Sequence, residues 1–226
     1  MAGRVFLVTG AFGALGSAVA QAAAEQGACV ALVDYAKAPS SPTPDGALAL
    51  GGVDLTDANQ AGAAIEAAAE RFGGIDALLN IAGGFAWETI ADGGAATWDR
   101  LYALNVKTAL NACRAALPML GAGASIVNIG AAAAARAEAG MGAYAASKSG
   151  VARLTEALAA ELKPRRIRAN AILPSIIDTP ANRADMPKAA VSKWVTPDEI
   201  AEVIAFLLSA AASGVTGALI PVTGRV

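Results

Sequence analysis

The feature that most constrains the fold is a glycine-rich turn between a short apolar strand and an alanine-rich helix. The strand reads RVFLVT over residues 4–9, the turn TGAFGALG places glycines at 10, 13 and 16, and helical residues continue to Gly27. Glycine lets the backbone turn tightly and lets a pyrophosphate approach the helix amino terminus, where free N–H groups favour negative charge. The turn therefore predicts a dinucleotide-binding unit.

Apolar strands and helices alternate along the rest of the chain. The expected strands are 4–9, 28–34, 47–54, 75–80, 124–130, 166–173 and 218–222, and the expected helices are 14–27, 57–72, 95–120, 142–162 and 196–211. Long helices between continuous apolar strands are typical of a parallel sheet covered on both faces. We expect one α/β domain over residues 1–226: a doubly wound Rossmann domain with a parallel sheet of about seven strands.

Composition excludes several function classes. The 17 basic and 19 acidic residues give a net charge of −2, so no basic surface for nucleic acid is expected. The chain has no histidine and its 2 cysteines form no CxxC, which excludes ordinary zinc sites and His-dependent triads. No long apolar run or cleavable signal is evident, so we expect a cytoplasmic protein with no membrane partner and no metal.

An acidic residue at the end of the second strand indicates the cofactor. Asp34 lies 18 positions after Gly16, where a carboxylate accepts hydrogen bonds from the adenosine ribose and would repel a 2′-phosphate. No arginine occurs between Arg4 and Arg71, and Lys37 is the only cation near that position. We expect NAD(H) to be preferred, with NADP(H) not excluded.

Tyr144 and Lys148 form a YxxxK pattern at the start of a predicted helix. The spacing of four places both side chains on one helical face. A phenol has a reference pKa of about 10, and we expect a nearby ammonium and an oxidised nicotinamide to lower the pKa of Tyr144. The pair therefore predicts acid–base chemistry beside the dinucleotide.

Together these motifs resemble the short-chain dehydrogenase/reductase family over essentially the whole chain. By that resemblance Tyr144 would be the general acid–base, Lys148 would lower its pKa and hold the nicotinamide ribose, and Asn105 in LNV would support a proton path. The resemblance implies cofactor contacts from the turn, from VDL, from the NIAG strand end, from the catalytic pair and from LPSIIDT: Gly10, Phe12, Gly13, Ala14, Leu15, Asp34, Asp54, Leu55, Asn80, Ala82, Gly83, Tyr144, Lys148, Pro174, Ile177 and Thr179.

Two positions depart from the family pattern. Ala14 replaces a usual turn glycine, and the middle glycine is Gly13. The catalytic serine is expected thirteen residues before Tyr144, where this chain has Ala131. A methyl group cannot donate a hydrogen bond to a substrate oxygen, and losing one such donor typically costs about 3 to 4 kcal/mol of transition-state stabilisation. Ordinary carbonyl reduction is therefore not the obvious reaction.

The dihydropteridine reductases are a subgroup that also lacks this serine. This chain is similar to them in GALGS, AGG and GMGAY, and above all in LPSIIDTPANRADMP followed by KWVTP. A quinonoid dihydropterin is a conjugated imine that needs no donor to an alkoxide. The favoured function is thus hydride transfer from NADH to a small electrophile such as this pterin, with a substrate loop at about 174–197.

Two alternatives remain open. One is a carbonyl or alcohol oxidoreductase in which water or another side chain does the task of the serine. For Ser147, inside YAASK, we expect a local hydrogen bond rather than this replacement. The other is a non-catalytic dinucleotide-binding protein. The resemblance also implies a homodimer or homotetramer joined through the helices at 95–120 and 142–162, whose alanine-rich faces permit close packing.

Overall fold

Seven parallel strands form a single sheet in the computed structural model, which describes residues 1–226. Their order across the sheet is β3-β2-β1-β4-β5-β6-β7. The strands are β1 (Val5–Thr9), β2 (Cys29–Asp34), β3 (Leu48–Gly51), β4 (Ile75–Asn80), β5 (Leu120–Ile129), β6 (Arg168–Pro174) and β7 (Leu219–Val222). The predicted Rossmann domain with seven parallel strands is confirmed.

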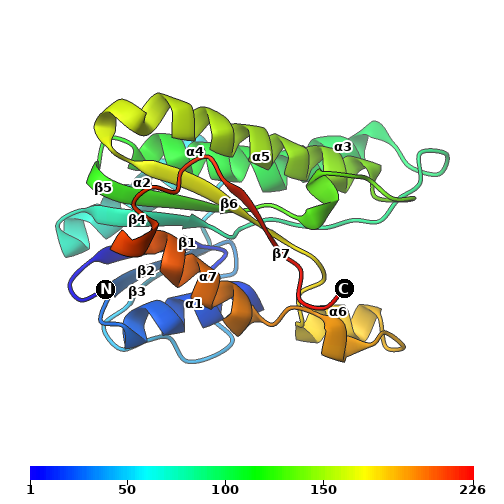
Figure 1. The fold of residues 1–226 in the computed structure, drawn as a ribbon, viewed down its shortest axis with the longest axis horizontal. Coiled ribbons are helices and arrows are strands. Elements are labelled where there is room, and N and C mark those ends of the chain that lie inside the picture. Colours follow the sequence, from blue (N-terminus) through cyan, green and yellow to red (C-terminus); the bar gives the residue numbers. More distant parts are fainter.

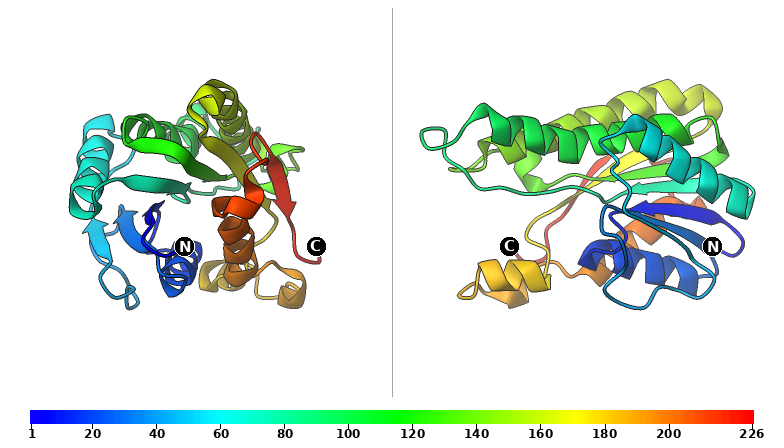
Figure 2. Two further views of the ribbon diagram at one scale, coloured as in Figure 1. Left: turned by 60° about the vertical axis from the view of Figure 1, so that its left-hand side comes forward. Right: turned by 180° about the vertical axis from the view of Figure 1, so that it is seen from behind.

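Helices cover both faces of this sheet, as Figures 1 and 2 show. Helices α1 and α7 pack on one face, while α2, α4 and α5 pack on the other. The helices are α1 (Ala14–Glu25), α2 (Ala58–Phe72), α3 (Ala95–Tyr102), α4 (Thr108–Ala116), α5 (Gly142–Leu162), α6 (Pro180–Asp185) and α7 (Pro197–Leu208). None of them is both long enough and apolar enough to cross a bilayer.

The two hydrophobic cores follow from the alternation of side chains along each strand. In β1, Phe6 and Val8 pack with α1 and α7, whereas Leu7 packs with α2, α4 and α5. Successive side chains of a strand point to opposite faces, so a strand covered on both faces must be apolar throughout. All five residues of β1 are buried, which explains the continuous apolar run in the sequence.

The strand order reverses between β1 and β4, and this reversal positions the functional site. The chain runs outward through β2 and β3 and then returns to pair β4 with β1. Thr9, at the end of β1, accepts hydrogen bonds from the backbone N–H groups of Ile81 (3.2 Å) and Ala82 (3.3 Å). Ligands of open α/β sheets bind at such a reversal, outside the carboxyl ends of the strands.

The single helix expected at 95–120 is wrong in two respects. Helix α3 ends at Tyr102, a π-helical turn spans Ala103–Lys107, and α4 ends at Ala116. Strand β5 then begins at Leu120 rather than at residue 124. The sequence gives no signal for the π turn because its residues have ordinary helix propensities, and the turn depends on tertiary contacts.

The segment 174–197, expected to be a loop, contains the short α-helix α6. Thr179 caps this helix, α6, by accepting from the N–H of Asn182 at 3.2 Å, and Pro180 occupies its first position. The predicted capping box at the start of α7 is present, since Thr196 and Glu199 each accept from the other's backbone N–H group. Strand β3 is shorter than the predicted 47–54.

Candidate active site

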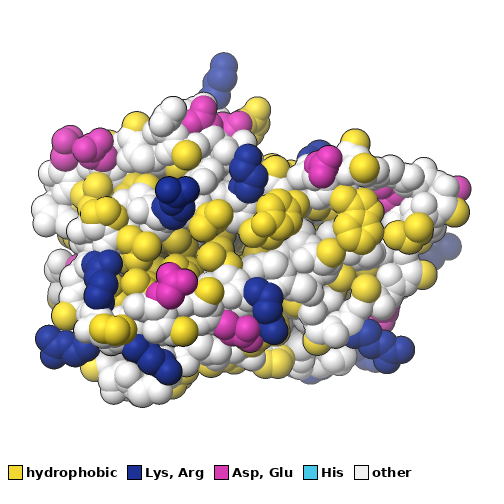
Figure 3. Space-filling model, turned by 90° about the horizontal axis from the view of Figure 1, so that it is seen from above, with side chains coloured by type: hydrophobic (Ala, Val, Ile, Leu, Met, Phe, Trp, Pro, Cys, Tyr) yellow, Lys and Arg dark blue, Asp and Glu magenta, His cyan; other side chains and the backbone are white.

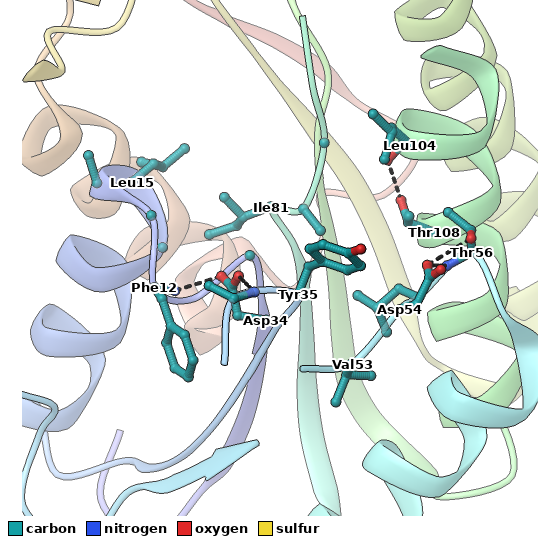
Figure 4. A pocket seen from close by; sticks show the side chains of 18 of the residues that line it. Phe12, Leu15, Asp34, Tyr35, Val53, Asp54, Thr56, Ile81, Leu104 and Thr108 are labelled. Atoms are coloured by element: carbon teal, nitrogen blue, oxygen red, sulfur yellow. Dashed lines mark hydrogen bonds between the residues drawn. The ribbon is translucent and has the colours of Figure 1, made fainter. Parts of the chain in front are cut away.

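A cavity of about 720 Å³ opens at the carboxyl ends of β1, β2 and β4. Ten of the residues expected to contact the cofactor line it: Gly10, Phe12, Gly13, Ala14, Leu15, Asp34, Asp54, Leu55, Ala82 and Gly83. Figure 4 shows Asp34 and Asp54 as they lie in this cavity, with Tyr35 drawn between them. The cavity is therefore formed by the elements from which a dinucleotide site was predicted.

Two glycines of the first turn are sterically required. Gly10 has a φ of +65°, and a Cβ at that position would lie 2.7 Å from the backbone nitrogen of Ala82. A Cβ on Gly16 would overlap the carbonyl oxygen of Gly10. The backbone of the turn thus packs against the first turn of α1 and against the end of β4 more closely than any side chain would allow.

Both acidic residues in the cavity are held in place by hydrogen bonds that their carboxylates accept. The Asp34 carboxylate accepts from the N–H groups of Phe12 and Ala36, each at 2.9 Å. Asp54 accepts from the N–H group of Thr56 at 2.8 Å and from its hydroxyl at 2.7 Å. Asp34 therefore links the end of β2 to the glycine turn and presents a fixed negative charge in the cavity.

Lys148 and Asn105 meet the cavity at Gly83. A Cβ on Gly83 would lie 2.5 Å from Asn105 Oδ1 and 3.4 Å from Lys148 Nζ. The Lys148 ammonium donates to the carbonyl of Ile129 at 2.8 Å. Asn105, inside the π turn, accepts from the N–H of Gly84 at 2.9 Å and donates to the Gly84 carbonyl at 3.0 Å. Two of the three predicted catalytic residues thus adjoin the predicted cofactor segment.

Tyr144 lies one helical turn before Lys148 in α5. The Lys148 Nζ atom is 6.0 Å from the centroid of its ring, and Phe85 packs edge-on against the ring with centroids 4.9 Å apart. Burial raises the pKa of Tyr144 to about 12. Burial favours the neutral phenol, and it outweighs the lowering of the Tyr144 pKa that we expect from the ammonium at this distance.

The ammonium of Lys148 is itself buried. Its side chain is only 5% exposed, and this burial lowers the pKa of Lys148 to about 8. A buried cation without a carboxylate partner is stabilised only by its hydrogen bonds, here the one to Ile129. Near neutral pH the site therefore combines a protonated phenol with an ammonium close to its own pKa.

No hydroxyl occupies the position of the usual serine. Ala131 is 6% exposed and follows the buried end of β5, at the start of a short turn. The nearby Ser147 is engaged elsewhere, since it donates to the carbonyl of Tyr144 at 2.7 Å and accepts from Asn105 at 2.9 Å. Its oxygen therefore serves the internal structure of α5, as a local hydrogen-bonding role predicts.

Six of the sixteen predicted cofactor residues do not line the cavity: Tyr144 and Lys148 of α5, described above, and four others. Asn80 is buried between strands, where it donates to Asn128 Oδ1 at 2.8 Å and to the Cys113 sulfur at 3.3 Å. Pro174 ends β6, Ile177 pairs with Val195 through an isolated bridge, and Thr179 caps α6. Sequence position alone does not show which way a strand end or a loop turns.

Several lining residues were not identified from the sequence. They follow the predicted acids or belong to neighbouring segments: Tyr35, Ala36, Ala38, Ser40, Val53, Thr56, Ile81, Leu104 and Thr108. For the residues between Tyr35 and Thr56, the only signal in the sequence is that they lie near Asp34 or Asp54 along the chain. Leu104 and Thr108 reach the cavity because the π turn brings this part of the chain toward Gly83.

Comparison with known proteins agrees with this geometry. A family model described as enoyl-(acyl carrier protein) reductase matches residues 10–224. The 2-(S)-hydroxypropyl-CoM dehydrogenase 3 of Xanthobacter autotrophicus is 34% identical, over 98% of this chain and 95% of that protein. The crystal structure of a short-chain dehydrogenase/reductase described as glucose/ribitol dehydrogenase, from Brucella melitensis, superposes with a TM-score of 0.91 at 34% identity, over 99% and 96% of the two chains.

Two further solved structures contain a pyridine nucleotide. A short-chain dehydrogenase from Burkholderia cenocepacia in complex with NADP gives a TM-score of 0.86 at 30% identity, over 99% of this chain and 97% of that one. A 3-ketoacyl-(acyl-carrier-protein) reductase from Brucella melitensis complexed with NADH gives a TM-score of 0.86 at 31% identity, over 99% of this chain and 98% of that one.

The fold, the cavity and these relatives define an NAD(P)-dependent oxidoreductase with a Rossmann fold. The chain belongs to the short-chain dehydrogenase/reductase family.

Proposed function

We propose that this protein is an NADH-preferring reductase that delivers hydride to a conjugated imine, with a quinonoid dihydropterin as the best candidate substrate. The observation that carries the proposal is the buried methyl of Ala131, thirteen residues before Tyr144, in a chain that keeps the Tyr144 and Lys148 pair on α5. The site keeps its proton donor but has no hydroxyl at the position that would stabilise an alkoxide.

The residues of the cavity fit a dinucleotide. Gly10 in the turn before α1 and Gly16 in the first helical turn pack so closely that neither position could hold a Cβ. This is the arrangement that accepts a pyrophosphate. Asp34 and Asp54 would hold the adenosine end, and Gly83, next to Lys148, would lie at the nicotinamide end.

The cofactor, when bound in its reduced form, supplies the hydride. The chain supplies the proton: with a pKa of about 12, Tyr144 is a neutral phenol across the physiological range and is ready to donate from its hydroxyl oxygen. Lys148 would hold the nicotinamide ribose through its buried ammonium. Asn105 keeps the Gly84 backbone and Ser147 in place through three hydrogen bonds.

A conjugated imine suits this site because its reduction produces an amine. Hydride adds at one end of the conjugated system, and nitrogen takes the proton from Tyr144, so no localised oxyanion develops. Loss of an oxyanion donor, which costs about 3 kcal/mol in enzymes that depend on it, would then carry little penalty. Phe85 beside Tyr144 and Trp87 on the same loop are 56% and 62% exposed, and both rings offer stacking area to a flat heterocycle.

Preference for NADH over NADPH rests on Asp34. Its carboxylate is fixed in the cavity by two backbone N–H groups. A 2′-phosphate placed there would meet a negative charge, and no arginine lines the cavity to offset it.

A carbonyl or alcohol oxidoreductase is the second candidate. It is favoured by the relatives, among which are proteins named as a 2-(S)-hydroxypropyl-CoM dehydrogenase and a 3-ketoacyl-(acyl-carrier-protein) reductase. Under this alternative a water molecule would take the place of the missing hydroxyl.

Stopped-flow oxidation of NADH separates the candidates. We expect turnover with quinonoid dihydropterin and little with a panel of ketones, and we expect Tyr144→Phe to lose at least a hundredfold in turnover while still binding NADH. Ala131→Ser should leave pterin reduction nearly unchanged. A large gain on ketones in that variant would favour the second candidate, and NADH binding without any turnover would indicate a non-catalytic protein.

We also propose that the chain forms a homodimer or homotetramer through the α4 and α5 face. Figure 3 shows hydrophobic side chains among the charged ones on the side seen from above. Ala146, Ala157 and Ala160 of α5 are exposed, and Tyr102 at the end of α3 is 53% exposed. Small side chains permit close helix approach, and sedimentation of the protein measures the assembly size directly.

A further inference from the structure

A second cavity, of about 620 Å³, lies at the opposite end of the sheet from the dinucleotide site. It is found where β1 and β6 begin and α7 ends, on the left of Figure 1. Four basic residues line it, namely Arg4, Lys163, Arg166 and Arg168, and no acidic residue does. A concentration of like charge in one concave surface attracts anions.

These four charges have no carboxylate partners. The three ion pairs of the chain lie elsewhere, between Arg153 and Glu156, Arg183 and Asp178, and Arg225 and Glu199. The Asp76 carboxylate, next to β1, accepts from the N–H of Val5. Burial, together with the charge of Arg4, lowers the pKa of Arg168, which indicates that the two guanidinium groups repel one another.

Part of this charge stabilises the carboxyl terminus of α7. Arg4 donates to the carbonyl of Leu208, and Arg168 Nη2 lies 3.5 Å from the carbonyl of Ser209. Cations at this end of a helix are favourable. Stabilisation of α7 does not account for all four basic residues. Lys163 and Arg166 do not reach these carbonyls, and Arg168 Nη1 is buried without any hydrogen-bond partner.

Arg166 has an unusual backbone conformation for a side chain of its size. Its φ of +56° makes it the only non-glycine residue with a positive φ in the chain. Glycine would adopt this conformation with less strain. The backbone alone forms the turn, since the Arg166 N–H donates to Lys163 and its carbonyl accepts from Gly123, each at 2.9 Å. The turn therefore does not need the arginine side chain.

We propose that this cavity binds a small ligand that carries two or more linked phosphate groups. Its volume is within the range of small-molecule sites. Guanidinium groups match phosphate oxygens in geometry as well as charge, and three arginines, Arg4, Arg166 and Arg168, line this cavity. Four uncompensated cations favour a polyanion over a single carboxylate. The ligand could be free pyrophosphate or a nucleoside diphosphate, which share this chemistry.

Calorimetric titration of the full chain with pyrophosphate, at constant ionic strength, tests the proposal. We expect binding that weakens about tenfold in Arg166→Gly, which keeps the turn conformation. Arg71→Gln removes one positive charge from the end of α2, outside the cavity, and should bind as the original chain does. A parallel titration with ADP distinguishes free pyrophosphate from a nucleotide. If ADP binds more tightly than pyrophosphate, and Arg166→Gly loses this binding, the ligand is a nucleotide.

Absence of heat at millimolar pyrophosphate would overturn the proposal. So would equal affinity in the original chain, in Arg166→Gly and in Lys163→Ala, since the anion would then be bound elsewhere, for instance at the glycine turn. Thermal unfolding of each variant accompanies the titrations. Arg166→Gly is expected to unfold at the same or a higher temperature than the original chain, so weaker binding in it would report the loss of the side chain.

Discussion

The side-chain amide of Asn105 donates to the hydroxyl of Ser147 over 2.9 Å, and the same hydroxyl donates to the carbonyl of Tyr144 over 2.7 Å. One buried oxygen thus joins the π turn to the first turn of α5. Ser147→Ala leaves one Asn105 N–H without its acceptor in a buried position, so we expect the free energy of unfolding to fall by about 1 to 2 kcal/mol.

Urea denaturation measures this change. Ser17→Ala is the matched control, because the Ser17 hydroxyl also donates to a backbone carbonyl in a helix but is exposed. The control should change stability by less than about 0.5 kcal/mol. Equal effects of the two substitutions would show that the bond between Asn105 and Ser147 contributes nothing specific.

Gly16→Ala and Gly13→Ala should behave very differently although they lie in the same turn. A Cβ on Gly16 would overlap the Gly10 carbonyl oxygen, whereas a Cβ on Gly13 would lie 3.5 Å from that same oxygen, an ordinary contact. We expect Gly16→Ala to displace the turn, to destabilise the protein by about 2 kcal/mol or more, and to abolish NADH binding. Gly13→Ala should retain both properties. Fluorescence titration with NADH checks the pair, and tight binding by Gly16→Ala would contradict the steric account.

Asp34→Asn should weaken the preference for NADH. The amide keeps the size of the side chain but removes the charge that would repel a 2′-phosphate, so we expect the ratio of kcat/KM for NADH to that for NADPH to fall about tenfold. Most of the change should appear as a lower KM for NADPH. Asp45→Asn, in the exposed loop before β3, removes the same charge from a residue that does not line the cavity and serves as the control. An unchanged ratio in Asp34→Asn would remove Asp34 from cofactor selection.

Lys148 makes stability depend on pH in a specific direction. Its pKa is about 8 in the folded chain against an ordinary value of 10.5, so between these values the unfolded chain binds more protons. Stability from this group therefore rises as pH increases from about 8 to 10, by roughly 2 kcal/mol relative to Lys148→Met. Above pH 10, the raised pKa of Tyr144 makes stability fall as pH increases, because the folded chain keeps a proton that the unfolded chain has lost. Urea denaturation across this range should give a flatter profile for Lys148→Met, and parallel profiles would contradict the buried ammonium.

The fold and part of the site follow from the sequence because their signals are local. Seven apolar strands, the glycine turn and the spacing of Tyr144 and Lys148 need only a few neighbouring residues to be recognised. Gly10, Asp34 and Gly83 follow different strands, and the fold brings them together in one cavity.

Properties that depend on tertiary surroundings were not predictable in the same way. The pKa of Tyr144 follows from how deeply α5 places its ring, and no spacing rule encodes that depth. A motif assigns Asn80 to the cofactor, whereas in the structure its amide nitrogen donates to Asn128 and to the Cys113 sulfur, and its buried oxygen has no hydrogen-bond partner. Ser147 was correctly given a local role, whereas its bond to Asn105 depends on the π turn.

The π turn at Ala103–Lys107 also fixes the length of this part of the chain. The N–H of Thr108 bonds to the carbonyl of Ala103, which encloses one residue more than ordinary helical winding does. A deletion of one residue there would let regular helical winding resume and would remove the wide turn that carries Asn105. Asn105 could then not keep both of its bonds to Gly84. A change of chain length between residues 103 and 107 should therefore disturb the site even though no residue outside this turn is altered.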